Sequence, residues 1–338
     1  KMRILVTGGA GYIGSHTMLE LFAGGHEVYV IDNFVNASPV CLERVAHLSN
    51  HSFSTTSANV ADEVALSEIF QSFKPEAVLH FAGLKAVAES ETLPLSYYEQ
   101  NICSTIELLK AMDRHECKTI VFSSSATVYG VPHYLPYDEE HPCTPVNPYG
   151  RTKYFNEQIL SDWSATGDGK SAILLRYFNP VGAHKSGEIG EAPHGIPNNL
   201  VPYIAQVAIG QRAKVSVFGN DYNTPDGTGV RDYIHITDLA EGHAAALDYA
   251  LHHSGAEIIN LGTGRGHSVL EMIAAFETAS GQQINYQIMP RRAGDIDSFF
   301  ADATKAKTLL GWHAKRGVDE MCQDVWRWQS DNPAGFKS

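Results

Sequence analysis

The sequence contains few cysteines, and they form no recognisable pattern. The five cysteines are widely scattered, and no two of them form a Cys-x-x-Cys pair. Neither a disulfide framework nor a structural zinc site is therefore indicated. The sixteen histidines also lack the spacing of ligand motifs such as His-Glu-x-x-His, so we expect no metal centre.

Positive charge and long apolar runs are scarce as well. The formal net charge of the 338 residues is −13 at pH 7, which argues against a general nucleic-acid binder because phosphate contacts need a basic surface. No stretch of eighteen uninterrupted apolar residues is present, so neither a transmembrane span nor a membrane partner is expected. The first residues contain no basic and apolar leader, and we therefore expect a cytoplasmic protein.

The first residues contain a pattern typical of dinucleotide binding. A short apolar run at residues 3–7 is followed by Gly8, Gly11 and Gly14 and then by apolar residues at helical spacing. Gly8 permits a tight turn, Gly11 lets the backbone approach a pyrophosphate, and Gly14 lets helix and strand pack closely. The helix N-terminus would then direct unpaired N–H groups at the phosphates.

An acidic residue follows at the expected distance from these glycines. The next apolar run, residues 27–31, ends at Asp32, where a carboxylate can accept hydrogen bonds from both hydroxyls of the adenosine ribose and would repel a 2′-phosphate. The pattern therefore predicts NAD rather than NADP. Asn33 and Asn36 follow on the same loop and could complete the ribose contacts.

Two further strand-and-helix units follow. A strand is expected at residues 52–60, whose end could border the adenine, and another at residues 77–80. The chain leaves the second strand beside the expected cofactor, so Lys85 is either a solvated lysine or a contact to cofactor oxygens. A helix is expected at residues 94–115.

A set of proton-transfer residues is predicted around the next strand. Residues 119–122 form an apolar, β-branched run typical of a buried parallel strand, and Ser125 would lie just beyond its C-terminal end. Asn147 is an N-cap candidate directly before a proline, so a helix should begin there. Tyr149 and Lys153 would lie on one face of this helix, where the ammonium can favour the phenolate and make Tyr149 a base.

Regular alternation of strand and helix signals ends near residue 183, beyond which glycine, proline and asparagine become frequent. We therefore expect an α/β protein with a Rossmann-like, doubly wound parallel sheet and a smaller mixed α/β C-terminal substrate lobe. Residues 1–183 would form the NAD-binding domain and residues 184–338 the substrate lobe. Within the lobe, residues of about 230–265 are expected to return to the main domain, with strands at 230–239 and 258–262 that could join the main sheet.

Taken together, the motifs resemble the extended short-chain dehydrogenase/reductase family. The resemblance rests on the glycine motif, on the Ser-rich segment 123–130, on Tyr149-x-x-x-Lys153 and on residues 231–233. Within this family, three segments resemble the UDP-glucose 4-epimerases, namely residues 81–87, 176–184 and 195–200. The similarity extends from about residue 3 to residue 328, which is nearly the whole chain.

This resemblance implies reversible epimerisation of UDP-galactose and UDP-glucose at sugar C4, using bound NAD without net redox change. Tyr149, with Lys153 and Ser125, would take the proton of the 4-hydroxyl while the C4 hydride passes to nicotinamide. The resulting 4-keto sugar would turn over and receive the hydride on its opposite face. The chemistry asks for a firmly anchored UDP and a loosely held hexose. The resemblance also implies a homodimer that packs the helices at 94–115 and 149–163.

The resemblance assigns contacts to both ligands. The residues expected to bind NAD are Gly8, Gly11, Tyr12, Ile13, Gly14, Asp32, Asn33, Asn36, Asn59, Val60, Phe81, Ala82, Gly83, Lys85, Asn101, Ser123, Tyr149, Lys153 and Tyr177. The residues expected to bind the UDP-hexose are Lys85, Ser125, Ala126, Thr127, Tyr149, Phe178, Asn179, Asn199, Leu200, Ser216, Val217, Phe218, Arg231, Tyr233, Arg292, Asp295 and Phe299.

Three other functions are less favoured. Sugar-nucleotide 4,6-dehydratases of this family have an Asp-Glu pair where this chain has Ala126 and Thr127, which disfavours elimination. UDP-glucuronate enzymes need a cation for the C6 carboxylate, for which the sequence offers no clear candidate, and they remain the second candidate. A non-catalytic NAD-binding regulator could use the same fold, but it would not need Tyr149 together with Lys153 and Ser125.

Some positions depart from the family pattern. Ala37 replaces a familiar serine, and Asn59 stands where an aspartate often meets adenine, so slightly altered NAD contacts are expected. Phe299 lies where the family varies the width of the sugar pocket. We expect its bulk to exclude UDP-N-acetylglucosamine.

Overall fold

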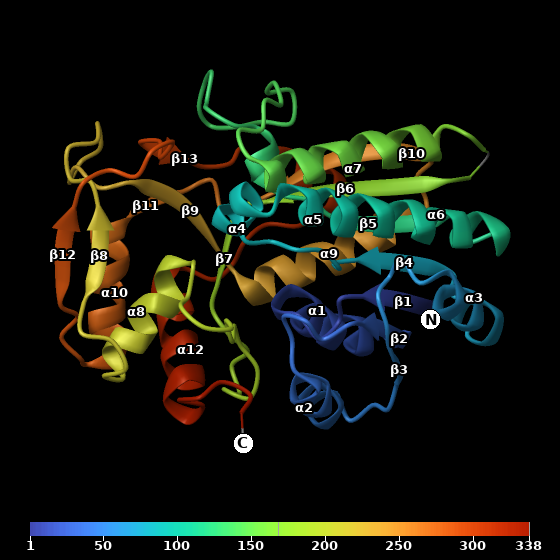
Figure 1. Cartoon of the computed structure of the whole chain (residues 1–338), viewed down its shortest axis with the longest axis horizontal. Coiled ribbons are helices and arrows are strands. Elements are labelled where there is room, and N and C mark those ends of the chain that lie inside the picture. The colour runs from blue at the N-terminus through green and yellow to red at the C-terminus, as the bar shows by residue number, and fades with distance from the viewer. Residues whose placement is uncertain (168, 338) are drawn as a thin grey trace.

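The computed structural model describes residues 1–167 and 169–337. Its main layer is a parallel sheet of seven strands in the order β10-β6-β5-β4-β1-β2-β3 (Figure 1). The strand order reverses at β1, which pairs with β2 on one side and with β4 on the other. Ligands of open α/β sheets bind at such switch points. The strands are β1 (Arg3–Thr7), β2 (Glu27–Asp32), β3 (Ser54–Ser57), β4 (Ala77–His80), β5 (Thr119–Ser123), β6 (Ser171–Tyr177) and β10 (Gly255–Leu261).

Helices cover both faces of this sheet, because its strands are apolar on both sides. Along β1, Ile4 and Val6 belong to the buried cluster on one face, and Leu5 belongs to the cluster on the other. The predicted Rossmann-like, doubly wound architecture is therefore confirmed. The first face packs against α1 (Tyr12–Ala23), α2 (Pro39–Ser49), α9 (Ile236–Ala250) and α11 (Thr304–Leu310), and the second against α3 (Glu63–Ser72), α6 (Ser104–Arg114) and α7 (Pro148–Ser164).

A smaller mixed lobe lies beside the carboxyl ends of the main strands (Figure 1). Its first sheet has the order β11-β9-β13, with β7 pairing β9, and its second sheet pairs β12 with β8. A third apolar cluster lies between these strands and the lobe's helices. The elements are β7 (Asn179–Val181), α8 (Leu200–Ala208), β8 (Val215–Phe218), β9 (Val230–His235), β11 (Gly266–Ser268), α10 (Val269–Ser280), β12 (Tyr286–Met289), β13 (Ser298–Phe299) and α12 (Val318–Asp331).

The return of the chain to the main sheet is only partly as expected. β10 joins the main sheet beside β6, whereas β9, which was expected to join it as well, lies in the sheet of the lobe. The reason is that β9 pairs in parallel with β7, which continues the chain directly after β6. The following helix α9 does return, and it packs against the main sheet.

Two expected elements are shorter or less regular than their sequences suggested. The strand expected at 52–60 is reduced to β3, an edge strand whose side chains are mostly exposed. The helix expected at 94–115 is α5 (Pro94–Tyr98), a π-helical turn at Glu99–Cys103, and α6. A π-turn changes the helical register, as is common at functional sites. In the described part of the chain, no helix is long and apolar enough to cross a membrane.

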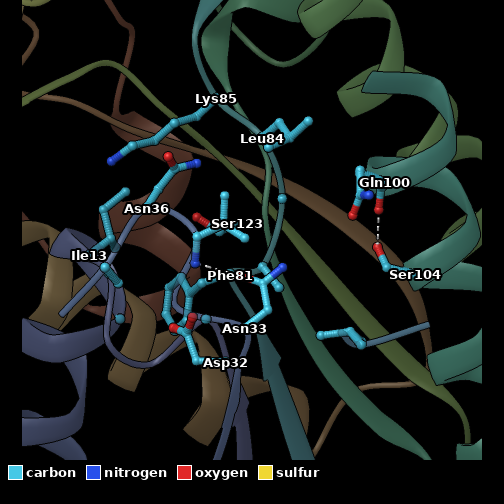
Figure 2. Close-up of a pocket in the computed structure, with 18 of the residues that line it drawn as sticks. Ile13, Asp32, Asn33, Asn36, Phe81, Leu84, Lys85, Gln100, Ser104 and Ser123 are labelled. Carbon is cyan, nitrogen blue, oxygen red and sulfur yellow. Dashed lines mark hydrogen bonds between the residues drawn. The ribbon is translucent and has the colours of Figure 1, made fainter. Parts of the chain in front are cut away.

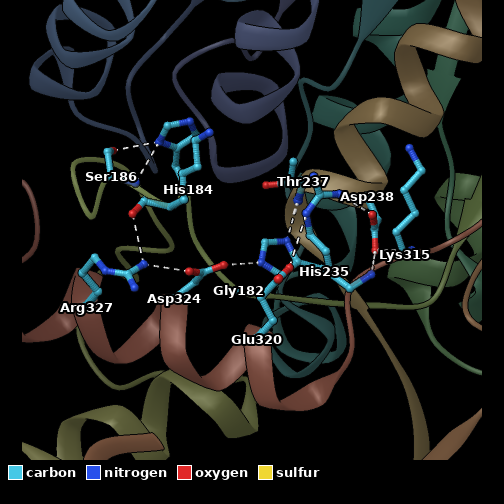
Figure 3. Close-up of polar contacts among 12 residues, drawn as sticks. Gly182, His184, Ser186, His235, Thr237, Asp238, Lys315, Glu320, Asp324 and Arg327 are labelled. Carbon is cyan, nitrogen blue, oxygen red and sulfur yellow. Dashed lines mark hydrogen bonds and ion pairs between the residues drawn. The ribbon is translucent and has the colours of Figure 1, made fainter.

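The junction between sheet and lobe contains a buried histidine (Figure 3). His235 at the end of β9 accepts the N–H of Thr237 at Nδ1, at 2.9 Å, and contacts Asp324 of α12 through Nε2 at 2.7 Å. Nε2 must therefore be the protonated nitrogen of the neutral ring. The ring thus ties the start of α9 to α12.

Candidate active site

A cavity lies at the carboxyl ends of the main strands, at the switch point of the sheet (Figure 2). It is lined by every residue expected to bind the cofactor except Asn101. Five further lining residues were not predicted: Val35, Ala58, Leu84, Gln100 and Ser104. Ala37, which was expected to alter the NAD contacts slightly, also lines the cavity.

The glycines at the floor of this cavity are sterically required. A Cβ at Gly14 would lie 2.5 Å from the carbonyl oxygen of Gly8, and a Cβ at Gly8, whose φ is +70°, would lie 2.8 Å from the nitrogen of Ala82. Gly11 is the N-cap of α1 and provides no side-chain cap, so the first N–H groups of the helix are available to a ligand. This cradle fits the pyrophosphate of a dinucleotide.

Asp32 lies at the end of β2, on the edge of the cavity. Its Oδ2 accepts the N–H of Ala10 at 3.0 Å, and its Oδ1 accepts the N–H of Phe34 at 2.8 Å. Burial raises the pKa of Asp32, and the two backbone hydrogen bonds oppose this shift. Each carboxylate oxygen can accept a second hydrogen bond, so the residue fits a ribose diol.

Tyr149 and Lys153 lie at the start of α7, as predicted. The side chain of Asn147 caps the helix by accepting the N–H of Gly150 at 2.8 Å. Lys153 is buried, and its Nζ donates to the carbonyl oxygen of Ser123 at 2.9 Å. The same Nζ lies 5.9 Å from the centre of the Tyr149 ring. The helix and β5 together fix the ammonium beside the phenol.

Burial affects both members of this pair. It raises the pKa of Tyr149, and a hydrogen bond with Ser125 opposes this shift. It lowers the pKa of Lys153 to about 8, with Lys85 acting in the same direction and Glu157 against it. Lys153 is therefore positive at neutral pH. For Tyr149 the desolvation outweighs its neighbours, so a phenolate needs a further positive charge nearby.

Ser125 stands between the strand and the phenol. Its hydroxyl oxygen accepts the N–H of Thr127 at 3.2 Å and the hydroxyl hydrogen of Thr127 at 2.8 Å. With these two bonds accepted, the Ser125 proton is free to be donated elsewhere. The residue is therefore suited to pass a proton to or from Tyr149.

Glu157 is a site residue that the sequence analysis missed. It lies on α7 one turn beyond Lys153 and is completely buried. It accepts the hydroxyl of Ser124 at 2.6 Å and a bidentate pair from Arg176 at 2.6 and 3.0 Å. The repeat of polar residues at every fourth position, Tyr149, Lys153 and Glu157, was the available signal. Glu157 fixes the serine segment to the helix.

Asn101, which is expected to bind NAD, holds a loop of the cavity in this structure. Its Oδ1 accepts the N–H of Leu84 at 2.7 Å, and its Nδ2 donates to the carbonyl oxygen of Leu84 at 3.0 Å. Nδ2 also donates to Thr152 at 3.0 Å. The π-turn thus directs the amide at the loop before Lys85, and this loop, rather than Asn101, lines the cavity.

An aromatic wall forms where the main domain meets the lobe, from Tyr137 and Phe178 of the main domain and Phe299 of the lobe. The ring centre of Phe299 lies 4.6 Å from that of Tyr137 and 5.2 Å from that of Phe178. Asn179, the residue after Phe178, begins β7. Ala126 packs into the same cluster. Tyr137 belongs to this wall but was not predicted, because it lies in the loop between the Ser-rich segment and α7, outside both motifs.

Two predicted arginines lie near the edge of the lobe. Arg231 donates to the carbonyl oxygens of Val230 and Ile296 at 2.8 and 3.1 Å. Arg292 pairs with Asp295 at 2.9 Å and lies 4.6 Å from the centre of the Phe218 ring. They provide local positive charge in an acidic protein.

The remaining residues expected to bind the sugar nucleotide differ in their burial and in their contacts. Asn199, the N-cap of α8, donates to Glu191 at 2.9 Å, and Leu200 begins the helix. Ser216 lies on β8 and is half-buried. The side chains of Val217 and Tyr233 pack in the apolar core of the lobe, and burial raises the pKa of Tyr233 to about 12. These two side chains support the lobe.

Among residues 1–167 and 169–337, one group of possible metal ligands is found, and it lies outside the cavity. His235, Glu320 and Asp324 bring one ligand atom each to within 4.8 Å of one another. The hydrogen bond from Thr237 occupies Nδ1 of His235, and Arg327 already pairs with Asp324 at 2.8 Å. Asp324 is therefore held by a hydrogen bond from the neutral His235 and by an ion pair with Arg327.

The comparisons with known proteins agree with this geometry. The family model described as GDP-mannose 4,6 dehydratase matches residues 5–325. A UDP-glucose 4-epimerase of Bacillus subtilis (strain 168) is 56% identical over 337 residues, covering 100% of this chain and 99% of that protein. The human UDP-glucose 4-epimerase is 54% identical over 343 residues, covering 99% of this chain and 98% of that protein.

Solved structures lead to the same family. The UDP-glucose 4-epimerase from Bifidobacterium longum, crystallised with NAD+ and UDP, has a TM-score of 0.95 and 51% identity. The match covers 98% of this chain and 99% of that chain. The chain therefore belongs to the UDP-glucose 4-epimerase family of the extended short-chain dehydrogenases/reductases.

Proposed function

We propose that the protein interconverts UDP-galactose and UDP-glucose by inverting C4 of the hexose, with NAD as its cofactor. The observation that supports this most directly is the position of Tyr149, Lys153 and Ser125 around a cavity built for a dinucleotide. Relatives of at least 53% identity over nearly the whole chain are UDP-glucose 4-epimerases. A binding regulator would have no use for the proton-transfer set.

The main domain, residues 1–183, would hold the cofactor. Gly8, Gly11 and Gly14 form the cradle for the pyrophosphate, and Asp32 is placed for the ribose. NAD bound in this cavity supplies the reversible oxidation of the sugar C4. The carboxylate of Asp32 would repel a 2′-phosphate, so NAD is preferred to NADP.

The chain's own residues move the proton. Tyr149 takes the proton of the 4-hydroxyl and returns one to the 4-keto sugar after it has turned over. Lys153, held by the carbonyl oxygen of Ser123, keeps a positive charge beside the phenol below pH of about 8. Ser125 passes the proton between phenol and sugar. Such acid–base catalysis contributes about 10² to 10⁴ in rate.

The lobe, residues 184–338, would bind UDP and leave the hexose mobile. Arg231 and Arg292 offer charge to the UDP phosphates, whereas the aromatic wall offers the hexose few directional bonds. Binding energy is therefore concentrated on the part of the substrate that does not react. The bulk of Phe299 in this wall would exclude an N-acetyl group.

We also propose a cytoplasmic homodimer. Leu95, Ile106 and Phe155 are 82%, 37% and 41% exposed on α5, α6 and α7, the helices for which family resemblance implies a dimer. All five cysteines are free, as is usual in reducing compartments. Light scattering at micromolar concentration should give the mass of a dimer, and a monomer would contradict this assembly.

The first experiment is to incubate the purified protein with UDP-galactose, with no added cofactor, and to follow UDP-glucose with a coupled dehydrogenase. Product would establish 4-epimerisation by an enzyme that retains NAD through purification. If no product forms even after NAD is added, the proposal fails, and UDP-glucuronate substrates are tested next.

A further inference from the structure

Asp232 is a buried carboxylate with an unusual set of partners. It is completely inaccessible to solvent, and no ion pair among the described residues includes it. Instead, Oδ1 accepts the N–H and the hydroxyl of Thr263 at 3.0 and 2.6 Å, and Oδ2 accepts the N–H groups of Gly264 and Ala301 at 3.0 and 3.1 Å. A charge buried in this way is retained only where its hydrogen bonds are satisfied.

These bonds join three segments that are distant in sequence. Asp232 lies on β9, Thr263 and Gly264 follow β10, and Ala301 follows β13. The segments are in close contact, because a Cβ at Gly262 would lie 2.7 Å from Cβ of Ala301 and 2.8 Å from Oδ2 of Asp232. The carboxylate is therefore the point at which the three backbones are held together.

The segment after β13 positions the aromatic wall. Phe299 lies on β13 in register with Arg231, the residue before Asp232. The hypothetical Cβ at Gly262 would also lie 3.3 Å from the ring of Phe178. Among the described residues, Phe299 pairs with a named strand only at β9, over two residues. The segment after it is held on one side by Tyr137, through backbone bonds to Phe300 and Asp302 at 3.0 and 2.8 Å, and on the other side by the bond from Ala301 to Asp232. The bond to Asp232 is therefore the side-chain restraint that joins this segment to β9.

We propose that Asp232 is a positioning residue that holds Phe299 against Phe178 and thereby sets the largest hexose that the pocket admits. The inference rests on the proposed function, because it concerns the sugar of the UDP-hexose. Asp232 is inaccessible to solvent and is not among the residues that line the dinucleotide cavity, so its effect on discrimination acts through the β13 backbone.

The test is to replace Asp232 by asparagine and to measure kcat/KM for UDP-glucose and UDP-N-acetylglucosamine. The amide has one acceptor oxygen, and its NH₂ group must face the N–H of Thr263 or those of Gly264 and Ala301, so the three segments are held together less firmly. We expect kcat/KM for UDP-N-acetylglucosamine to rise about tenfold relative to kcat/KM for UDP-glucose, which is a usual size for the effect of a change in pocket width. An equal loss of activity with both sugars would overturn the proposal.

A matched control is Asp238→Asn. Asp238 is also buried and also accepts backbone N–H groups from a distant segment, those of Lys315 and Arg316 at 3.0 and 2.9 Å (Figure 3). It lies on α9, away from the aromatic wall. The control should lower the melting temperature and leave the sugar ratio unchanged. A similar rise of the ratio in the control would mean that general loosening, not Asp232, widens the pocket.

A milder variant covers the case in which Asp232→Asn does not fold. Thr263→Val removes only the hydroxyl donor at 2.6 Å and keeps the backbone bonds, so a smaller rise of the ratio is expected, and no rise would overturn the proposal. If the wild type itself fails to epimerise UDP-galactose, the proposed function fails first. In that case, the affinities of the wild type and of the variant for the two UDP-sugars would be measured by calorimetry. A gain in relative affinity for UDP-N-acetylglucosamine in the variant would support the role of Asp232, and no gain would contradict it.

Discussion

Replacing Lys153 by methionine should make the nucleotide-free protein more stable at neutral pH while removing its activity. The lysine is buried and 6% exposed. Burial is the main reason that its pKa falls from 10.5 to about 8 on folding. The charged ammonium is thus destabilising in the folded protein, and methionine has a similar length without the charge.

The magnitude follows from the pKa. A tenfold change in a protonation constant corresponds to about 1.4 kcal/mol, so keeping Lys153 charged costs about 3 kcal/mol below pH 8. The variant also loses the hydrogen bond to Ser123, worth about 1 kcal/mol. The net gain in the free energy of unfolding at pH 7 is therefore about 2 kcal/mol.

The effect of Lys153→Met on the free energy of unfolding should change sign as the pH rises. Between pH 8 and 10.5 the unfolded chain binds more protons at this lysine than the folded one, so the wild type gains stability from it as pH rises. Above this window the variant should be less stable, by about 1 kcal/mol, because only the lost hydrogen bond remains.

Urea unfolding at pH 7 and near pH 10.5 would measure both effects, and turnover of UDP-galactose would measure the loss of activity, expected to be about 10² or more. Lys110→Met is a suitable control, because Lys110 is a lysine whose side chain is 54% exposed, and it should show no such pH dependence. If Lys153→Met destabilises the protein equally at both pH values, burial does not disfavour the ammonium, and the reasoning is wrong.

Three other variants test the remaining parts of the site. Tyr149→Phe removes only the hydroxyl, so kcat should fall by about 10² or more while NAD stays bound, as read from the absorbance of the purified protein; unchanged turnover would exclude Tyr149 as the base. Glu157→Gln leaves the buried Arg176 without its carboxylate, which should lower the free energy of unfolding in urea by about 3 kcal/mol; adding Arg176→Met should recover part of this loss, and a full loss in the double variant would contradict the account. Phe299→Ala should raise the turnover of UDP-N-acetylglucosamine relative to UDP-glucose by about tenfold; comparable turnover of the two sugars by the wild type would refute the selectivity assigned to Phe299.

The parts of the molecule that could be predicted depend on local chemistry. A glycine turn, an N-cap asparagine before a proline and an i,i+4 spacing each constrain the chain within a few residues. Helix α7 accordingly begins where its sequence indicates, with Tyr149 and Lys153 on one face. Asp32 likewise ends β2 at the cavity.

The interrupted helix shows where such local signals fail. The residues of Glu99–Cys103 have nothing that distinguishes a π-turn from an α-helix. The turn is stabilised by partners far along the chain: Asn101 is held by Leu84, Thr152 bonds its amide, and Asn156 donates to its carbonyl oxygen at 2.9 Å. Because these bonds exist only after α7 has packed, the side chain's direction is a tertiary property.

Buried carboxylates are the extreme case of this dependence. Asp232 and Glu157 are both inaccessible to solvent, yet the first is held by backbone N–H groups and the second by Arg176. In sequence, neither differs from an exposed acidic residue, because the donors that make its burial tolerable lie 19 to 69 positions away. A buried charge costs several kcal/mol unless such donors converge on it. Each of these carboxylates therefore marks a place where the fold needs several segments fixed at once, and here those places are the serine segment beside Lys153 and the backbone behind Phe299.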